Sequence, residues 1–120
     1  VGSEAPRIGM SFAELWQDSE QAMVRELESA IANGRVALAL ELCETLLSRV
    51  LASAASLFGT TDAPRDAAVV PLLLGLDGRR YLSFRALVRS ARSGTVVTGR
   101  DALQAYALLI DARIARNSVV

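Results

Sequence analysis

The sequence predicts an all-α fold, a compact bundle of four to five helices, and three observations lead to that prediction. Apolar residues recur every three to four positions in several long stretches, which is the period of a helix with a buried face. The apolar fraction is 52% but only 5% is aromatic, so Ala, Leu and Val supply a core suited to close helix packing. Residues that begin and end helices separate the stretches. The predicted helices cover residues 12–33, 35–58, 65–74, 79–93 and 99–116.

The domain organisation follows from chain length and local composition. At 120 residues the chain has the size of one ordinary domain. Residues 11–120 are predicted to form a single helical bundle domain. Residues 1–10 contain two glycines and a proline without helical periodicity, and we expect them to form a flexible N-terminal tail.

The first predicted helix, 12–33, begins at a pattern typical of a capping box, with Ser11 and Glu14 three positions apart. Asn33 and Gly34 supply its C-terminal stop. Its polar face is expected to carry Glu14, Asp18, Arg25 and Glu28. Its apolar face is expected to carry Phe12, Leu15, Trp16, Met23, Leu27, Ala30 and Ile31.

The second predicted helix, 35–58, is apolar over a wide arc and ends at Gly59. Leu38 and Leu42 lie outside that arc, so we expect the helix to contact neighbours on two sides, at the centre of the bundle. Glu41 and Glu44 are expected on its solvated face. The arc comprises Val36, Leu40, Cys43, Leu46, Leu47, Val50, Leu51, Ala54, Leu57 and Phe58.

The three remaining helices are shorter or carry apolar residues on more than one side. Pro71 predicts a kink or an early stop in helix 65–74, because an interior proline removes a backbone hydrogen bond. Asp77-Gly78 predicts a turn before helix 79–93, which Gly94 ends. Thr98 and Asp101 form a second capping-box pattern at the start of helix 99–116. Leu108 and Leu109 stand outside its main predicted inner arc, which consists of Leu103, Tyr106, Ala107, Ile110 and Ile114.

Composition excludes several chemistries. The chain has no histidine and one cysteine, Cys43, which removes the usual general base and any cysteine-rich zinc site, and we expect no catalytic residue, metal or cofactor. Cys43 is expected to be a buried structural thiol, and Trp16 a core residue.

All 13 basic residues are arginine in an alanine-rich chain, which indicates a GC-rich, bacterial genome. The absence of a leader pattern and of a long apolar run indicates a cytoplasmic protein without a membrane span.

Charge is balanced overall and uneven along the chain. Formal net charge is zero, but residues 1–60 hold eight acids against four arginines and residues 61–120 hold five against nine. A bundle with this uneven charge favours self-association or a charged partner. Its positive charge is too small for the basic surface that is typical of a nucleic-acid-binding protein.

One basic cluster is a candidate docking patch for an acidic partner or an anion, with a solvated arginine face as the alternative. It comprises Arg79, Arg80, Arg85, Arg89 and Arg92.

The layout of two long helices followed by a loop and a short helix resembles that of the HEPN domains of prokaryotic defence systems. The bundle is also similar to flagellar secretion chaperones. The HEPN ribonucleases use an arginine followed at four to six residues by histidine, and this chain has no histidine. The first resemblance therefore implies binding of RNA or a small anionic ligand through the Arg79–Arg92 helix, without nuclease activity. Neither resemblance rests on a sequence motif, and no family is assigned.

These observations favour a non-enzymatic protein-interaction module, an adaptor, chaperone-like or regulatory bundle that binds a protein partner or itself. A bundle of this size has few neighbours to cover apolar residues outside the inner arcs, and exposed apolar patches mark contacts. We therefore expect a homodimer, with self-association through Leu38, Leu42, Leu108 and Leu109.

Overall fold

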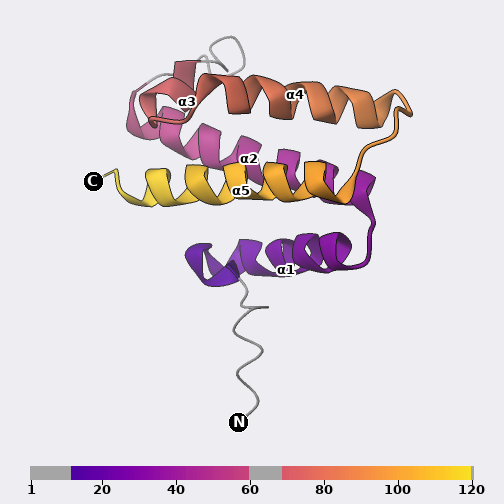
Figure 1. Ribbon diagram of the computed structural model, residues 1–120. Helices are drawn as coiled ribbons and strands as arrows, with labels where there is room; N and C mark the ends of the chain where they lie inside the picture. Colours follow the sequence, from indigo (N-terminus) through magenta and orange to yellow (C-terminus); the bar gives the residue numbers. More distant parts are fainter. Residues whose placement is uncertain (1–11, 60–68, 120) are drawn as a thin grey trace.

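The computed structural model describes residues 12–59 and 69–119, and helices make up 80% of them. A 3-10 turn, η2 (Ala13–Leu15), precedes α1 (Asp18–Ala32), α2 (Val36–Leu57), α3 (Val69–Leu73), α4 (Gly78–Arg92) and α5 (Gly99–Asn117). The described residues contain no strand. The predicted all-α bundle is therefore confirmed (Figure 1). The tail predicted at residues 1–10 lies outside the described residues.

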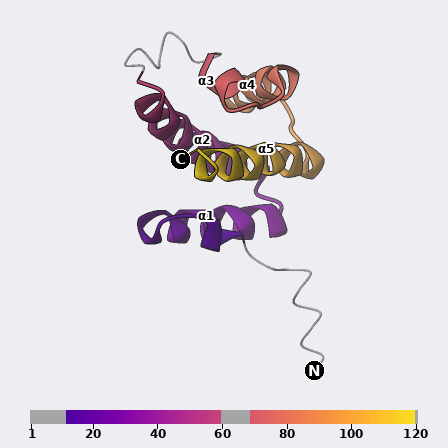
Figure 2. The same cartoon turned by 90° about the vertical axis from the view of Figure 1, so that its left-hand side faces the viewer.

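α2 lies at the centre of the bundle. It packs against α1, α4 and α5, and near its C-terminal end it packs against α3. In Figure 2, α1 lies on one side of the α2–α5 pair and α4 on the opposite side, so the molecule has three layers. The prediction that this helix contacts neighbours on more than one side is confirmed. Its buried residues are Ala39, Leu40, Cys43, Leu46, Leu47, Val50, Ala54 and Ala55.

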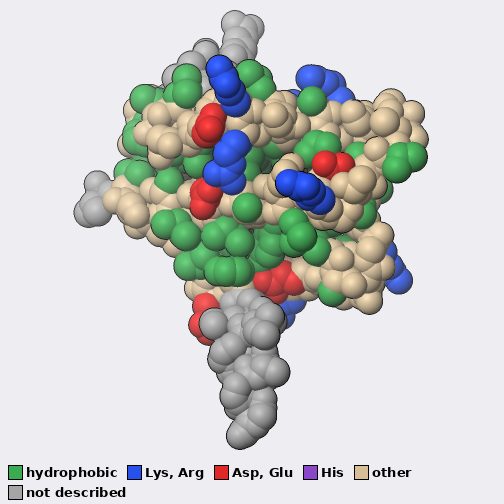
Figure 3. Space-filling model, viewed as in Figure 1, with side chains coloured by type: hydrophobic (Ala, Val, Ile, Leu, Met, Phe, Trp, Pro, Cys, Tyr) green, Lys and Arg blue, Asp and Glu red, His purple; other side chains and the backbone are tan. Residues whose placement is uncertain are grey.

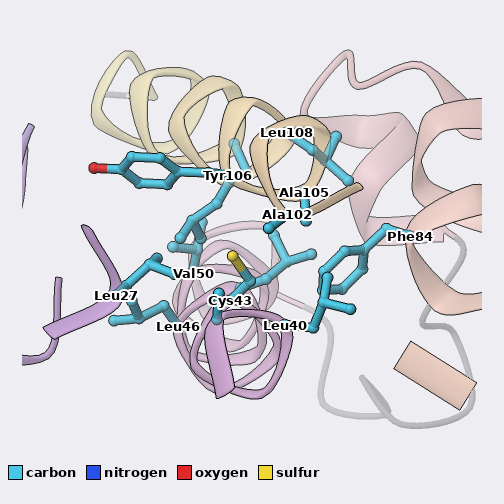
Figure 4. Close-up of a cluster of buried hydrophobic side chains, with 14 of the residues drawn as sticks. Leu27, Leu40, Cys43, Leu46, Val50, Phe84, Ala102, Ala105, Tyr106 and Leu108 are labelled. Carbon is cyan, nitrogen blue, oxygen red and sulfur yellow. The ribbon is translucent and has the colours of Figure 1, made fainter. Parts of the chain in front are cut away.

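The contact between α2 and α5 is built from small residues. Ala102, Ala105 and Ala112 of α5 are buried in the same core cluster as Ala39 and Cys43 of α2. Small side chains let two helix axes approach closely, because the distance between axes depends on the residues at the contact. Figure 4 shows Cys43 pointing from α2 toward α5, beside Ala102.

The predicted inner arc of the last helix is wrong. Leu108 and Leu109 are 1% and 0% exposed, whereas Leu103 and Ile114, assigned to the inner arc, are 57% and 47% exposed. The reason is that α5 has two apolar faces, and the face that carries its alanines packs closely against α2. Only Tyr106 of the predicted arc is buried.

The N-terminal helix is shorter than predicted. Residues 13–15 form the 3-10 turn, and Trp16 and Gln17 adopt extended ψ angles of 158° and 156° that separate it from α1. Glu28 accepts a hydrogen bond from the backbone N–H of Phe12 at 2.9 Å, so it does not lie on a free polar face. Ser11 of the predicted capping box lies outside the described residues. Trp16 is buried, as predicted.

Most other helix ends agree with the sequence signals. Gly34, Gly59 and Gly94 adopt φ angles of 74°, 78° and 87° at the ends of α1, α2 and α4, a backbone conformation that side chains disfavour. At the start of α5 the predicted capping box is present: Asp101 N–H donates to Thr98 Oγ1 at 3.2 Å and Thr98 N–H donates to Asp101 Oδ2 at 2.9 Å.

α3 is described over Val69–Leu73, and residues 65–68 of the predicted helix 65–74 lie outside the described residues. Pro71 is the third residue of this described part, where its missing N–H breaks no hydrogen bond of the described helix. The helix stops early, after Leu73. The turn before α4 is centred on Gly75, with φ of 82°, and Asp77 caps α4 by accepting from Arg79 N–H at 2.8 Å.

Two leucines of α5 test its orientation. We expect Leu109→Ala to lower the free energy of unfolding by about 2–5 kcal/mol, because it opens a cavity in the core. Leu103→Ala should change it by less than about 0.5 kcal/mol, because that side chain is mostly exposed. Urea unfolding followed by circular dichroism measures both values. Equal losses, or a larger loss for Leu103→Ala, would contradict the orientation.

Candidate protein-interaction surface

Four apolar residues form an exposed stripe along α5, which we call the α5 stripe: Leu103, Ala107, Ile110 and Ile114. Their spacing of four, three and four residues places them on one narrow face of the helix. Leu103, Ala107 and Ile114 are exposed, and Ile110 is half-buried. In Figure 3, hydrophobic side chains form a broad patch over α5 and its boundary with α1. The spacing matches the heptad seam along which two helices pair.

One edge of the α5 stripe is held against α1 and η2. Phe12, 45% exposed, extends the patch and packs edge-on against the Tyr106 ring, with centroids 6.2 Å apart. The Tyr106 hydroxyl donates to Glu28, which also accepts from the Phe12 backbone. Burial, reinforced by this carboxylate, raises the pKa of Tyr106, so the hydroxyl stays protonated as a donor. This edge of the surface is therefore preorganised.

Arg113 extends the same edge toward the C-terminal end of α5. Its Nε donates to the carbonyl of Leu15 at 2.8 Å, and its guanidinium lies 5.0 Å from the centre of the Trp16 ring. Burial lowers the pKa of this guanidinium, although its ordinary value is high enough for it to remain charged. The contact fixes η2 to α5 and supplies a charged rim beside Ile114.

The other edge of the α5 stripe borders a groove between α4 and α5, with a volume of about 380 Å³. Phe84, Leu87 and Leu108 supply its apolar lining, with Arg79 and Gln104 among its polar residues. Arg80 bridges α4 and α5 by an ion pair with Asp111 at 2.7 Å. Both side chains are about half exposed, and such a pair contributes at most about 1 kcal/mol.

The basic cluster predicted from the sequence is divided by contacts within the chain. Arg85 lies 3.6 Å from Glu44 of α2, and Arg92 pairs with the other oxygen of the same carboxylate. Glu44 was expected on a solvated face, but its side chain is only 18% exposed because α4 covers it. Arg80 pairs with Asp111. Among the described residues, no ion pair involves Arg79 or Arg89. The cluster is therefore not one continuous free basic patch.

The four leucines predicted to mediate self-association do not form a surface. Leu108 and Leu109 are buried in the core, so that assignment is wrong for them, because a second molecule cannot reach their side chains. Leu38 and Leu42 are half-buried and pack against the same core. Leu38 shares a shallow pocket with Val88 of α4. In place of these leucines, the structure exposes the α5 stripe.

A second group of exposed apolar residues lies where α2, α3 and α4 meet. Leu72 of α3 lies beside Gly78 of α4, because a Cβ atom added at Gly78 would be 3.6 Å from Leu72 Cδ2. Leu82 follows Gly78 by one helical turn. Leu57 and Phe58 precede residues 60–68 in the sequence, and Leu72 and Leu73 follow them; residues 60–68 lie outside the described residues. Its exposed members are Leu57, Phe58, Leu72, Leu73 and Leu82.

No protein-family model, curated protein or solved structure matches this chain. None of the helices in the described part of the chain is long and apolar enough to cross a membrane. Within residues 12–59 and 69–119, no group of three or more His, Cys, Asp or Glu side chains is placed to hold a metal ion.

Cys43 is buried in the core between α2 and α5, as predicted. Its burial raises the pKa of the thiol from 9.0 to about 12. A thiolate is the reactive form of cysteine, so this group is inert at neutral pH.

The raised pKa of Cys43 predicts a pH dependence of stability. Above the pKa of the unfolded thiol, the unfolded chain loses a proton that the folded chain retains. The free energy of unfolding therefore falls as the pH rises from about 9 toward about 12. Between pH 8 and pH 10, the wild type should lose about 1 kcal/mol more unfolding free energy than Cys43→Ala. Urea unfolding at both pH values measures the difference. Equal losses in both proteins, or fast labelling of the native protein by a thiol reagent, would contradict burial of this side chain.

Proposed function

We propose that this chain is a non-enzymatic protein-interaction module of the bacterial cytoplasm, which binds a helical segment of a protein partner along the α5 stripe. The exposure of Leu103, Ala107 and Ile114 at heptad spacing is the observation that carries the proposal. An amphipathic helix that presents apolar residues at the same spacing would bury the stripe.

The surroundings of the α5 stripe support this proposal. Protein interfaces combine an apolar centre with a polar rim. Here the rim contains Gln104 and Asp111 on one edge and Arg113 on the other. Phe12 adds an aromatic residue to the patch, and its contact with Tyr106 limits its motion. A surface held in place in the free protein loses less conformational entropy when a partner binds.

A second candidate function is binding of a small anionic ligand at the groove between α4 and α5. Arg79 lies at this groove, and its volume of about 380 Å³ is within the range of small-molecule sites. The apolar lining favours an anion with an apolar part, such as a short-chain carboxylate. RNA binding is less well supported, because Arg80, Arg85 and Arg92 pair with carboxylates of the chain itself.

Substitutions along the α5 stripe test the proposed function. Leu103→Glu and Ile114→Glu place charge on the apolar face and should abolish retention of a native partner on the immobilised protein. Leu82→Glu is the matched control, because Leu82 is a leucine of similar exposure on α4. A protein retained by wild type and Leu82→Glu but not by the stripe variants is then purified, and its affinity for all four proteins is measured by calorimetry.

The same measurement separates the two candidate functions. Arg79→Gln should leave the affinity for a protein partner unchanged. If partner binding survives in both stripe variants, the proposed surface is wrong. Binding of a short-chain carboxylate that is lost in Arg79→Gln and kept in Leu103→Glu would favour the second candidate.

A further inference from the structure

We infer that the α5 stripe pairs with the α5 stripe of a second copy of this chain, the two helices antiparallel about a two-fold axis between Ala107 and Ile110. This inference rests on the proposed function and names the partner of the same surface. A two-fold axis lets one patch serve both molecules, as in most homodimers.

The order of residues along the α5 stripe is self-complementary when one helix is reversed. With the axis between Ala107 and Ile110, Leu103 of one copy faces Ile114 of the other at each end of the contact. In the two central layers, Ala107 faces Ile110. Pairing a small residue with a large one near the axis allows close packing without voids.

Charge favours the antiparallel direction. Arg100 lies three residues before Leu103, in line with the seam, and no ion pair involves it among the described residues. In a parallel pair, each Arg100 would face the Arg100 of the other copy, a contact of like charges. In the antiparallel pair it faces Asn117, and Gln104 lies beside Asp111. The net charge of zero also leaves no overall repulsion between copies.

The size of the contact sets the expected strength of the dimer. From Leu103 to Ile114 the α5 stripe spans about 17 Å at 1.5 Å per residue. A two-helix contact of this length buries less than the standard interface of about 800 Å² per partner. The dimer should therefore form with micromolar affinity and depend on concentration.

Single surface cysteines test the direction of pairing, because Cys43 is buried and leaves an introduced thiol as the reactive one. When Leu103→Cys and Ile114→Cys proteins are mixed under oxidising conditions, the mixed disulfide should form faster than either symmetric one. Disulfides need Cα atoms within about 7 Å, and the antiparallel pair brings residue 103 close to residue 114 of the other copy but not to residue 103 of the other copy. Leu82→Cys is the control for random collision. Faster symmetric disulfides at both positions would show parallel pairing and overturn the inference.

Sedimentation across a concentration series tests the surface itself. The wild type should shift from 12.8 kDa toward twice that mass in the micromolar range. Ala107→Glu should remain monomeric, because it places a charge next to the axis, while its exposure leaves the fold intact. Leu82→Glu should dimerise as the wild type does.

The alternative outcomes are distinguishable. A wild type that stays monomeric at high micromolar concentration, but still binds a partner through the α5 stripe, would overturn self-pairing and leave the proposed function standing. A dimer that persists in Ala107→Glu and forms disulfides fastest through Leu82→Cys would overturn self-pairing through the α5 stripe, because its contact would lie elsewhere.

Discussion

α2 and α5 pack along a face on which half of the buried α5 residues are alanine. Ala102, Ala105 and Ala112 let the two helices lie close together, and they leave the larger Leu108 and Leu109 to fill the core on either side. Once this face is turned inward, the opposite side of α5 must face solvent. The exposed α5 stripe is therefore a consequence of how the core is packed.

The same contact explains why the other helices are arranged as they are. α2 is apolar over most of its circumference, so α1 and α4 cover the sides that α5 leaves open. Polar contacts then join the layers at their edges. Glu44 of α2 pairs with Arg85 and Arg92 of α4. Arg113 of α5 donates to the Leu15 carbonyl and lies over the Trp16 ring of the N-terminal segment. These pairs are partly exposed, and we attribute most of the stability to the apolar core.

Local signals predicted the helices and most of their ends. Gly34, Gly94 and the Thr98–Asp101 capping box act within a few residues, so a single sequence contains the information needed to find them. The inward face of α5 could not be chosen in this way. Its two apolar faces satisfy the same periodicity, and Leu103, Ile110 and Ile114 give the exposed face as strong a helical pattern as the buried one. Which face turns inward depends on how closely α5 packs against α2, and these two helices are distant in the sequence.

The basic cluster is a second case in which local sequence patterns do not predict a contact between distant segments. Helical spacing brought Arg85 and Arg92 together, but their shared partner Glu44 is distant in sequence, so the pattern alone suggested a free patch. The sequence contained a usable signal for the proposed interaction surface. The intervals of four, three and four residues from Leu103 to Ile114 are typical of a helix-pairing seam, whether it faces the core or solvent.

The exposure of individual methyl groups tests the central claim, that the packing of α5 on α2 turns the α5 stripe outward. In a methyl-labelled sample at low concentration, a soluble paramagnetic agent should relax the methyl groups of Leu103 and Ile114 strongly and those of Leu108 and Leu109 weakly. The effect on Leu103 and Ile114 should diminish as the protein concentration rises and the stripe becomes covered. Strong relaxation of Leu108 and Leu109, with Leu103 and Ile114 protected at every concentration, would contradict the account.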